Sequence, residues 1–78
     1  TCALNFKYVE ISGNSCGSTS NGGGIYTSTN TNVSLGDSVK IINNTKSGSA
    51  NNAYFGKENV SYNGQTYTKG TAITTDIQ

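Results

Sequence analysis

The chain has 78 residues and a formal charge of +1, and it contains no His, Arg, Met, Trp or Pro. Asn, Thr, Ser and Gly supply 42 residues, whereas Leu, Ile, Val and Phe supply only 14. Imidazole is the usual general base, and guanidinium is the usual grip on phosphate. Because both are absent and the lysines do not cluster into a basic face, the composition argues against an enzyme and against a nucleic-acid partner.

The length predicts a single β domain over residues 1–78 with a thin apolar core. Small scaffolds usually gain stability from disulfides, metals or oligomerisation. We expect no metal or other cofactor, because zinc and similar ions favour His or several Cys. No apolar run reaches the ~20 residues of a transmembrane helix, so no membrane partner is expected. Thr1 fits initiator Met removal and leader cleavage equally well.

The two cysteines, Cys2 and Cys16, are predicted to form a disulfide. The closed loop of about 15 residues would contribute roughly 3 kcal/mol in the chain-entropy model. Such a bond would imply an oxidising compartment or a particle exposed to one. Two reduced thiols are the alternative, and a catalytic thiol is not expected because no His or Arg can lower its pKa.

No segment reads as a helix, and short β-branched and aromatic runs separated by turn residues are typical of an all-β protein. The longest predicted strand is Ala3–Ile11, in which Leu4 and Phe6 share a face with Tyr8 whereas Val9 does not. Either this strand is buried on both sides or a bulge near Tyr8 changes its register.

The polar segment Ser12–Gly24 is predicted to be a flexible loop, followed by a short strand at Ile25–Ser28. Val33–Asn43 holds two apolar runs around Gly36-Asp37. A strict two-residue hairpin fits its pattern poorly, so a looser corner is as well supported. Asn44–Asn52 is predicted to be another polar loop.

The segment SLGDSVKIIN, residues 34–43, resembles the entry strand of cupredoxins and of many immunoglobulin-like sandwiches. The resemblance implies a β-sandwich. The copper ligands of cupredoxins are absent, so their function does not carry over.

Asn59–Thr68 carries the strongest local signal, because Asn63-Gly64 stands between two alternating strands. A type I′ turn requires positive φ at both central positions, which Asn and Gly tolerate. The predicted hairpin pairs Val60 with Tyr67 and Tyr62 with Gln65.

The last segment, Ala72–Gln78, alternates apolar and polar residues and is predicted to be an edge strand or to pair with another subunit. Its predicted interface residues are Ile73, Thr75 and Ile77.

The tyrosines offer a different function, since aromatic rings with polar tips can stack on sugars. The segment ENVSYNGQTY, residues 58–67, resembles the signature of small chitin-binding modules and segments of phage tail and fibre proteins. The first resemblance implies a carbohydrate partner, although those modules use exposed Trp. The alternative is that the tyrosines fill the core or a subunit interface; they are Tyr8, Tyr26, Tyr54, Tyr62 and Tyr67.

Three sequons make glycosylation conceivable on a secretory route, at Asn32, Asn43 and Asn59.

These patterns predict a small all-β sandwich or barrel of about six or seven short antiparallel strands. We expect a non-enzymatic structural subunit that binds copies of itself or other structural subunits. A small β-unit rich in Thr, Asn, Ser and Gly resembles phage virion accessory proteins of decoration, neck or fibre type. The alternatives are an extracellular fibril or pilus subunit joined by strand addition and a carbohydrate-binding module. The expected location is a virion or the extracellular space.

Overall fold

A computed structural model describes residues 2–78, and Thr1, whose origin the sequence leaves open, lies outside the described chain. All regular structure in these residues is β, as predicted. The strands are β1 (Cys2–Ser12), β2 (Ser15–Cys16), β3 (Ile25–Thr27), β4 (Thr31–Ile42), β5 (Thr45–Lys46), β6 (Ser49–Ala50), β7 (Ala53–Phe55), β8 (Val60–Tyr62), β9 (Gln65–Tyr67) and β10 (Ala72–Ile73).

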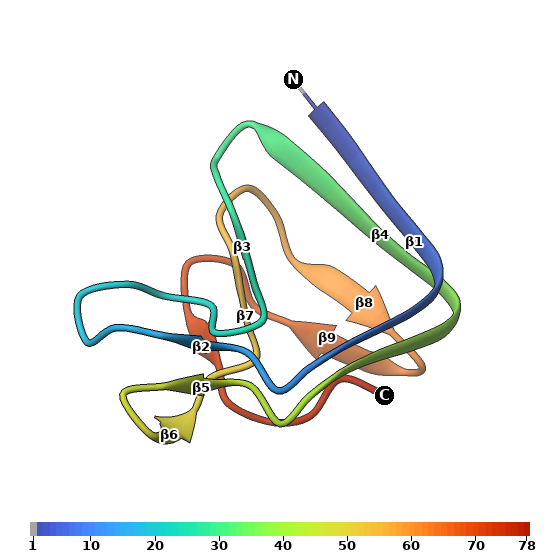
Figure 1. The fold of residues 1–78 in the computed structure, drawn as a ribbon. Coiled ribbons are helices and arrows are strands. Elements are labelled where there is room, and N and C mark those ends of the chain that lie inside the picture. Colours follow the sequence, from blue (N-terminus) through green and yellow to red (C-terminus); the bar gives the residue numbers. More distant parts are fainter. Residues whose placement is uncertain (1) are drawn as a thin grey trace.

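The chain winds through two stacked turns, which we call the first coil (β1, β2 and β3) and the second coil (β4, β5 and β7). Each strand of the first coil pairs in parallel with its counterpart in the second: β1 with β4, β2 with β5, and β3 with β7. Figure 1 shows the two coils following the same path, with β4 beside β1 and β7 beside β3. The arrangement is that of a short β-solenoid, in which each coil rests on the next.

The predicted sandwich or barrel of antiparallel strands is not confirmed. The longest pair, β1 with β4, is parallel, and no sheet closes on itself among residues 2–78. Parallel strands need a long connection, and here residues 13–30 return the chain to the start of β4. Local patterns of alternation identify strands but do not reveal which strands pair across such a connection.

The core is built from the second coil and the C-terminal elements, and apolar residues of the first coil pack against it. Within the register, Leu4 lies beside Val33, Val9 beside Val39 and Ile11 beside Ile41. The buried apolar residues are Val33, Val39, Ile41, Ala53, Phe55, Val60, Tyr67, Ile73 and Ile77.

A bulge bends the β1–β4 pair and confirms one of the two alternatives for this strand. The register shifts between Phe6 and Tyr8, so Lys7 alone faces both Gly36 and Asp37. Figure 1 shows both strands turning at this corner. The shift resets the alternation, which leaves Tyr8 72% exposed and brings the later apolar residues to the core side. Gly36-Asp37 lies at a corner, but it does not separate two strands, as either predicted alternative required, because β4 continues through it.

The hairpin at Asn63-Gly64 is confirmed in its predicted register, with Val60 opposite Tyr67. Asn63 and Gly64 have φ values of 50° and 81°, as a type I′ turn requires.

Two predicted loops contain short strands. β2 lies within Ser12–Gly24, and β5 and β6 form a tight hairpin within Asn44–Asn52. Its turn residues, Ser47 and Gly48, have φ values of 48° and 84°. These strands are made of Ser, Cys, Thr, Lys and Ala, so they carry no apolar alternation that would reveal them.

The predicted disulfide is wrong: Cys2 and Cys16 are not bonded to each other. Cys2 begins the long strand β1, and Cys16 lies in β2 beyond its far end. A strand extends by about 3.3 Å per residue, so β1 separates the two thiols even though the sequence spacing is short.

Candidate functional site

The two ends of the coil stack differ, and the second coil is covered at β5, at β7 and at one position of β4. β6 pairs with the outer side of β5, and β10 with the outer side of β7. On β4, Ile41 exchanges two backbone hydrogen bonds with Ile77, at N···O distances of 2.8 and 3.1 Å. β6, β10 and Ile77 therefore cap this end.

The first coil has no such cover within residues 2–78. β1, β2 and β3 each stand at the edge of their sheet. Their outer backbone groups form one continuous set of open strand edges, which we call the open end. Unpaired edges are templates for pairing with another strand.

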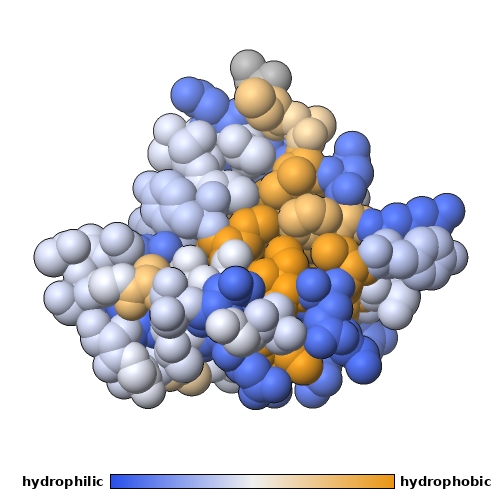
Figure 2. Space-filling view, viewed as in Figure 1, coloured by the Kyte–Doolittle hydropathy of each residue, from blue (hydrophilic) through white to orange (hydrophobic). Residues whose placement is uncertain are grey.

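Apolar side chains of the first coil reach this open end. Leu4, Val9, Ile11 and Ile25 are only partly buried, whereas their counterparts Val33, Val39, Ile41 and Ala53 in the second coil are buried. Phe6 and its counterpart Leu35 are both partly buried. Figure 2 shows hydrophobic residues exposed in the middle of the face seen in Figure 1, with polar residues around them. The layer is covered on the side of the second coil and uncovered on the other.

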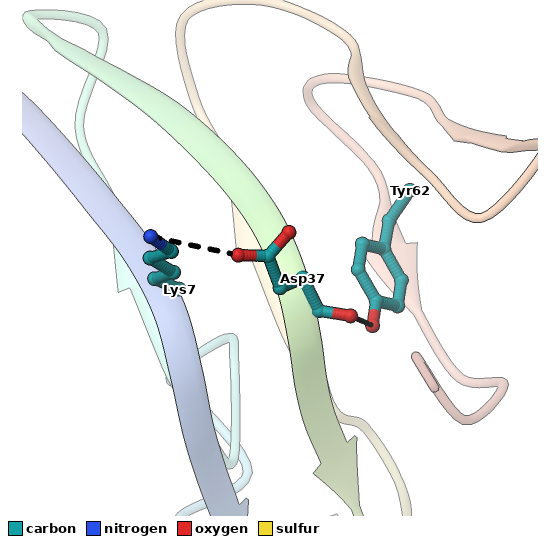
Figure 3. Close-up of polar contacts among 3 residues, drawn as sticks. All are labelled: Lys7, Asp37 and Tyr62. Atoms are coloured by element: carbon teal, nitrogen blue, oxygen red, sulfur yellow. Dashed lines mark hydrogen bonds and ion pairs between the residues drawn. The ribbon is translucent and has the colours of Figure 1, made fainter.

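The corner of β1 and β4 is held by polar contacts (Figure 3). The Lys7 ammonium lies 3.7 Å from the Asp37 carboxylate, and both side chains are exposed. The Tyr62 hydroxyl accepts a hydrogen bond of 2.8 Å from the Val39 backbone N–H. It donates one of 3.4 Å to the Asp37 carbonyl, which Figure 3 shows. An exposed ion pair contributes little, so the tyrosine hydroxyl is the main polar link between the β8–β9 hairpin and β4.

At the next corner Asn44 of the second coil contacts Asn14 of the first coil and Asn52 of its own coil, a feature that the sequence reasoning missed. Asn44 and Asn52 are each 1% exposed. The Asn44 carboxamide oxygen accepts from Asn14, and its nitrogen donates to the Ile11 carbonyl and to Asn52 at 3.0 and 3.1 Å. Stacked Asn side chains of this kind stabilise layered β-structure. The signal for them is an internal repeat, VEISGN at residues 9–14 and VKIINN at residues 39–44.

The glycine run next to these asparagines is a packing feature. A Cβ on Gly24 would lie 2.6 Å from the Asn44 side-chain nitrogen, and one on Gly23 would lie 2.3 Å from the Thr45 carbonyl. Gly23 and Gly24 also donate backbone hydrogen bonds to Asn51 and Asn52. Residues 22–24 lie in a loop, as predicted, and close packing fixes the positions of Gly23 and Gly24.

The five tyrosines do not form one surface. Tyr67 is buried, and burial raises the pKa of its hydroxyl, with a smaller contribution from the neighbouring Tyr62. Tyr26 and Tyr54 stack on each other across β3 and β7, with ring centroids 5.2 Å apart. Tyr26 remains 59% exposed and lines a hollow of about 390 Å³ with Thr19, Ser20 and Asn21.

The predicted interface residues occupy two environments. Ile73 and Ile77 are buried in the core of their own chain, and Thr75 is exposed. The apolar alternation of this segment is thus explained within the chain. The expected edge strand is present only at Ala72–Ile73, where β10 is the outer strand of its sheet, and Ile77 makes an isolated bridge to β4.

The three sequon asparagines lie on different elements. Asn32 is half-buried in β4, Asn43 is exposed at a turn with a φ of 56°, and Asn59 is exposed. The Asn59 side-chain oxygen accepts a hydrogen bond from the Lys69 backbone N–H.

Residues 2–78 contain no group of three or more His, Cys, Asp or Glu side chains arranged to hold a metal ion. The same residues include no helix of the length and hydropathy needed to cross a membrane. No family model, no curated protein and no solved structure matches this chain.

Proposed function

We propose that this chain is a non-enzymatic structural subunit that assembles through the open end of its first coil. The observation that carries the proposal is the asymmetry of the coil stack. One end is capped by β6, β10 and Ile77, and the other presents open strand edges around a half-exposed apolar layer. A strand-bearing surface seated there would satisfy the backbone groups and bury the layer together.

Within this role, the asymmetry favours a virion accessory protein over a fibril or pilus subunit. A fibril requires two complementary surfaces on each subunit so that growth continues. The outer sides of β5 and β7 are already paired within the chain, and Ile41 of β4 is bonded to Ile77. The second coil therefore offers an edge for addition only along the rest of β4. The phage setting itself rests on the composition and on the resemblance of residues 58–67 to tail and fibre segments.

Sedimentation of the purified chain tests the proposal. We expect a species larger than the 8.1 kDa chain that dissociates on dilution. Leu4→Lys, which places a charge in the half-buried layer, should weaken association at least tenfold, because a desolvated charge opposes burial. Ser34→Lys is the matched control, since Ser34 is exposed on β4. A chain that remains monomeric at millimolar concentration would exclude self-assembly through this end.

A second candidate function, saccharide binding, is favoured by the Tyr26–Tyr54 stack. The exposed ring of Tyr26 adjoins a hollow lined by Thr19, Ser20 and Asn21, which offer hydroxyl and carboxamide groups. An aromatic face beside neutral hydrogen-bonding groups suits an uncharged sugar ring.

Titration with a chitin tetrasaccharide checks this candidate. Tyr26→Ala should lower the affinity by tenfold or more, and Tyr8→Ala, which removes an exposed ring elsewhere, should leave it unchanged. Equal affinity of all three proteins, or no binding by the unmodified chain, would reject this sugar as a ligand of the hollow.

A further inference from the structure

The direction of the backbone groups along β1 follows from the bonds made by β4. The Val39 N–H bonds to Tyr62, and the Ile41 N–H and C=O bond to Ile77, so these core-facing residues direct their backbone groups away from β1. Along a strand of a parallel pair, successive residues alternate in the face that carries their side chain. They alternate in step in the side, towards or away from the partner strand, to which their N–H and C=O groups point. Core-facing residues of β1 therefore bond to β4, and its surface-facing residues point their N–H and C=O groups to the open end.

The bulge at the corner makes this outward set symmetric. Because the alternation resets there, the surface-facing residues are Asn5 and Lys7 before the corner and Tyr8 and Glu10 after it. The half-buried residues have the same symmetry, with Leu4 and Phe6 on one arm and Val9 and Ile11 on the other. Both sets are mirrored about the point between Lys7 and Tyr8.

From this symmetry we infer that the open end binds a second copy of this chain, with the two β1 strands antiparallel about a two-fold axis between Lys7 and Tyr8. This inference rests on the proposed function and names the partner of the same site. Asn5 then lies opposite the partner's Glu10, and Lys7 lies opposite the partner's Tyr8. All outward backbone groups of each arm meet outward groups of the other copy.

The same register matches the side chains. Leu4 lies opposite the partner's Ile11, and Phe6 opposite the partner's Val9, so apolar residues meet on the core side. On the surface side, Lys7 is a diagonal neighbour of the partner's Glu10, which places opposite charges within reach. A register shifted by one residue would set core-facing residues against surface-facing ones.

The corner is compatible with this pairing. A two-fold axis perpendicular to the sheet at the corner leaves both bends directed to the same side, so the two β1 strands follow each other along both arms. The result is a four-stranded sheet in the order β4, β1, β1 and β4 of the two copies. Each copy's second coil then lies at the outer end with its cap, so the assembly closes as a dimer.

Disulfide trapping tests the register. Asn5→Cys and Glu10→Cys are combined in a chain that also carries Cys2→Ser and Cys16→Ser. Directly opposite, hydrogen-bonded residues have Cα atoms about 5.5 Å apart, within the range of about 4.4–6.8 Å that a disulfide spans. Mild oxidation should convert most of the protein to covalent dimer. Within one chain the two positions lie on the same strand, too far apart to bond.

The control pair is Asn5→Cys with Ser12→Cys in the same background, two residues out of register. Diagonal positions lie about 7–8 Å apart, so this pair should form at least tenfold less dimer. Sedimentation of both proteins under reducing conditions separates the two proposals. If the proteins associate but the disulfide forms through the control pair, or through neither pair, the register is wrong and the structural role still stands. Absence of association would overturn both.

Discussion

At the residue scale, small polar side chains occupy buried positions in this protein that apolar side chains occupy in larger domains. Asn44 is 1% exposed, yet its side chain is satisfied on both the oxygen and the nitrogen. A buried amide with complete hydrogen bonding fixes the position of its neighbours, whereas a partly satisfied one would be costly. The abundance of Asn therefore has a structural explanation that composition alone does not provide.

Removal of the Asn44 side chain is the first prediction. Asn44→Ala should lower the free energy of unfolding by about 3 kcal/mol, because Asn14, Asn52 and the Ile11 carbonyl lose a buried partner. Asn30→Ala is the control, since Asn30 is exposed, and it should change stability by less than about 0.5 kcal/mol. Urea unfolding followed by circular dichroism measures both. Equal stabilities of the two variants would show that the asparagine stack is not a stabilising element.

The second prediction concerns Gly24, where the coils approach too closely for a side chain. Gly24→Ala should cost about 1–3 kcal/mol, because its Cβ would lie 2.6 Å from the Asn44 nitrogen and 2.7 Å from the Asn52 carbonyl. Gly17→Ala meets no atom within 4 Å and should be tolerated. Thermal unfolding of the two variants gives the comparison. A Gly24→Ala protein as stable as Gly17→Ala would contradict the close packing described for this glycine.

Tyr67 provides a prediction on pH. Burial raises the pKa of its hydroxyl above the ordinary value of 10.0, so the folded state holds this proton more tightly than the unfolded state. Its contribution to stability is complete below pH 10.0 and is lost as the pH rises from there through the folded-state pKa. The unfolding free energy should fall less steeply above pH 10.0 in Tyr67→Phe than in the unmodified chain. Parallel slopes in the two proteins would contradict the stated effect of burial.

At the scale of elements, the sequence predicts those strands whose pattern is local. The Asn63-Gly64 hairpin needs only a turn and two alternating strands, and both lie within residues 59–68. β1 is recognisable from its β-branched and aromatic residues, and the bulge near Tyr8 was one of two explanations for its reversed alternation. β2, β5 and β6 lack an apolar face because they lie away from the core. The sequence therefore predicts loops at these positions.

Docking of the β8–β9 hairpin on β4 depends on one hydroxyl, which gives an element-scale prediction. Tyr62→Phe should cost about 1–2 kcal/mol, because the N–H of the buried Val39 loses its acceptor. Tyr8→Phe removes an exposed hydroxyl and should be neutral within about 0.5 kcal/mol. Chemical denaturation measures the difference. If both substitutions are neutral, another contact holds the hairpin to β4.

At the scale of the whole molecule, the sequence shows the class of fold but not its topology. The parallel pairing of β1 with β4 depends on contacts between residues about 30 positions apart, such as Ile11 with Ile41. The repeat of VEISGN as VKIINN reflects this pairing, yet six residues are a weak signal unless the coils are already suspected. The candidate site could not be predicted from the sequence for the same reason, because the open end exists only once the coils stack.

The last prediction is that backbone amides exchange with solvent more slowly at the capped end of the coil stack than at the open end. In dilute protein, the amides of Val39 and Ile41 are bonded to Tyr62 and Ile77 and should exchange slowly. Those of Tyr8 and Glu10 point to the open end and should exchange quickly, although Val9 between them is bonded to β4 and slow. Raising the concentration should protect Tyr8 and Glu10 at least tenfold through strand pairing and leave Val39 unchanged. Residue-resolved exchange by NMR at two concentrations measures this. Slow exchange at Glu10 in the monomer would mean that its N–H is already paired within the chain, and the open end would then not be free to bind a partner.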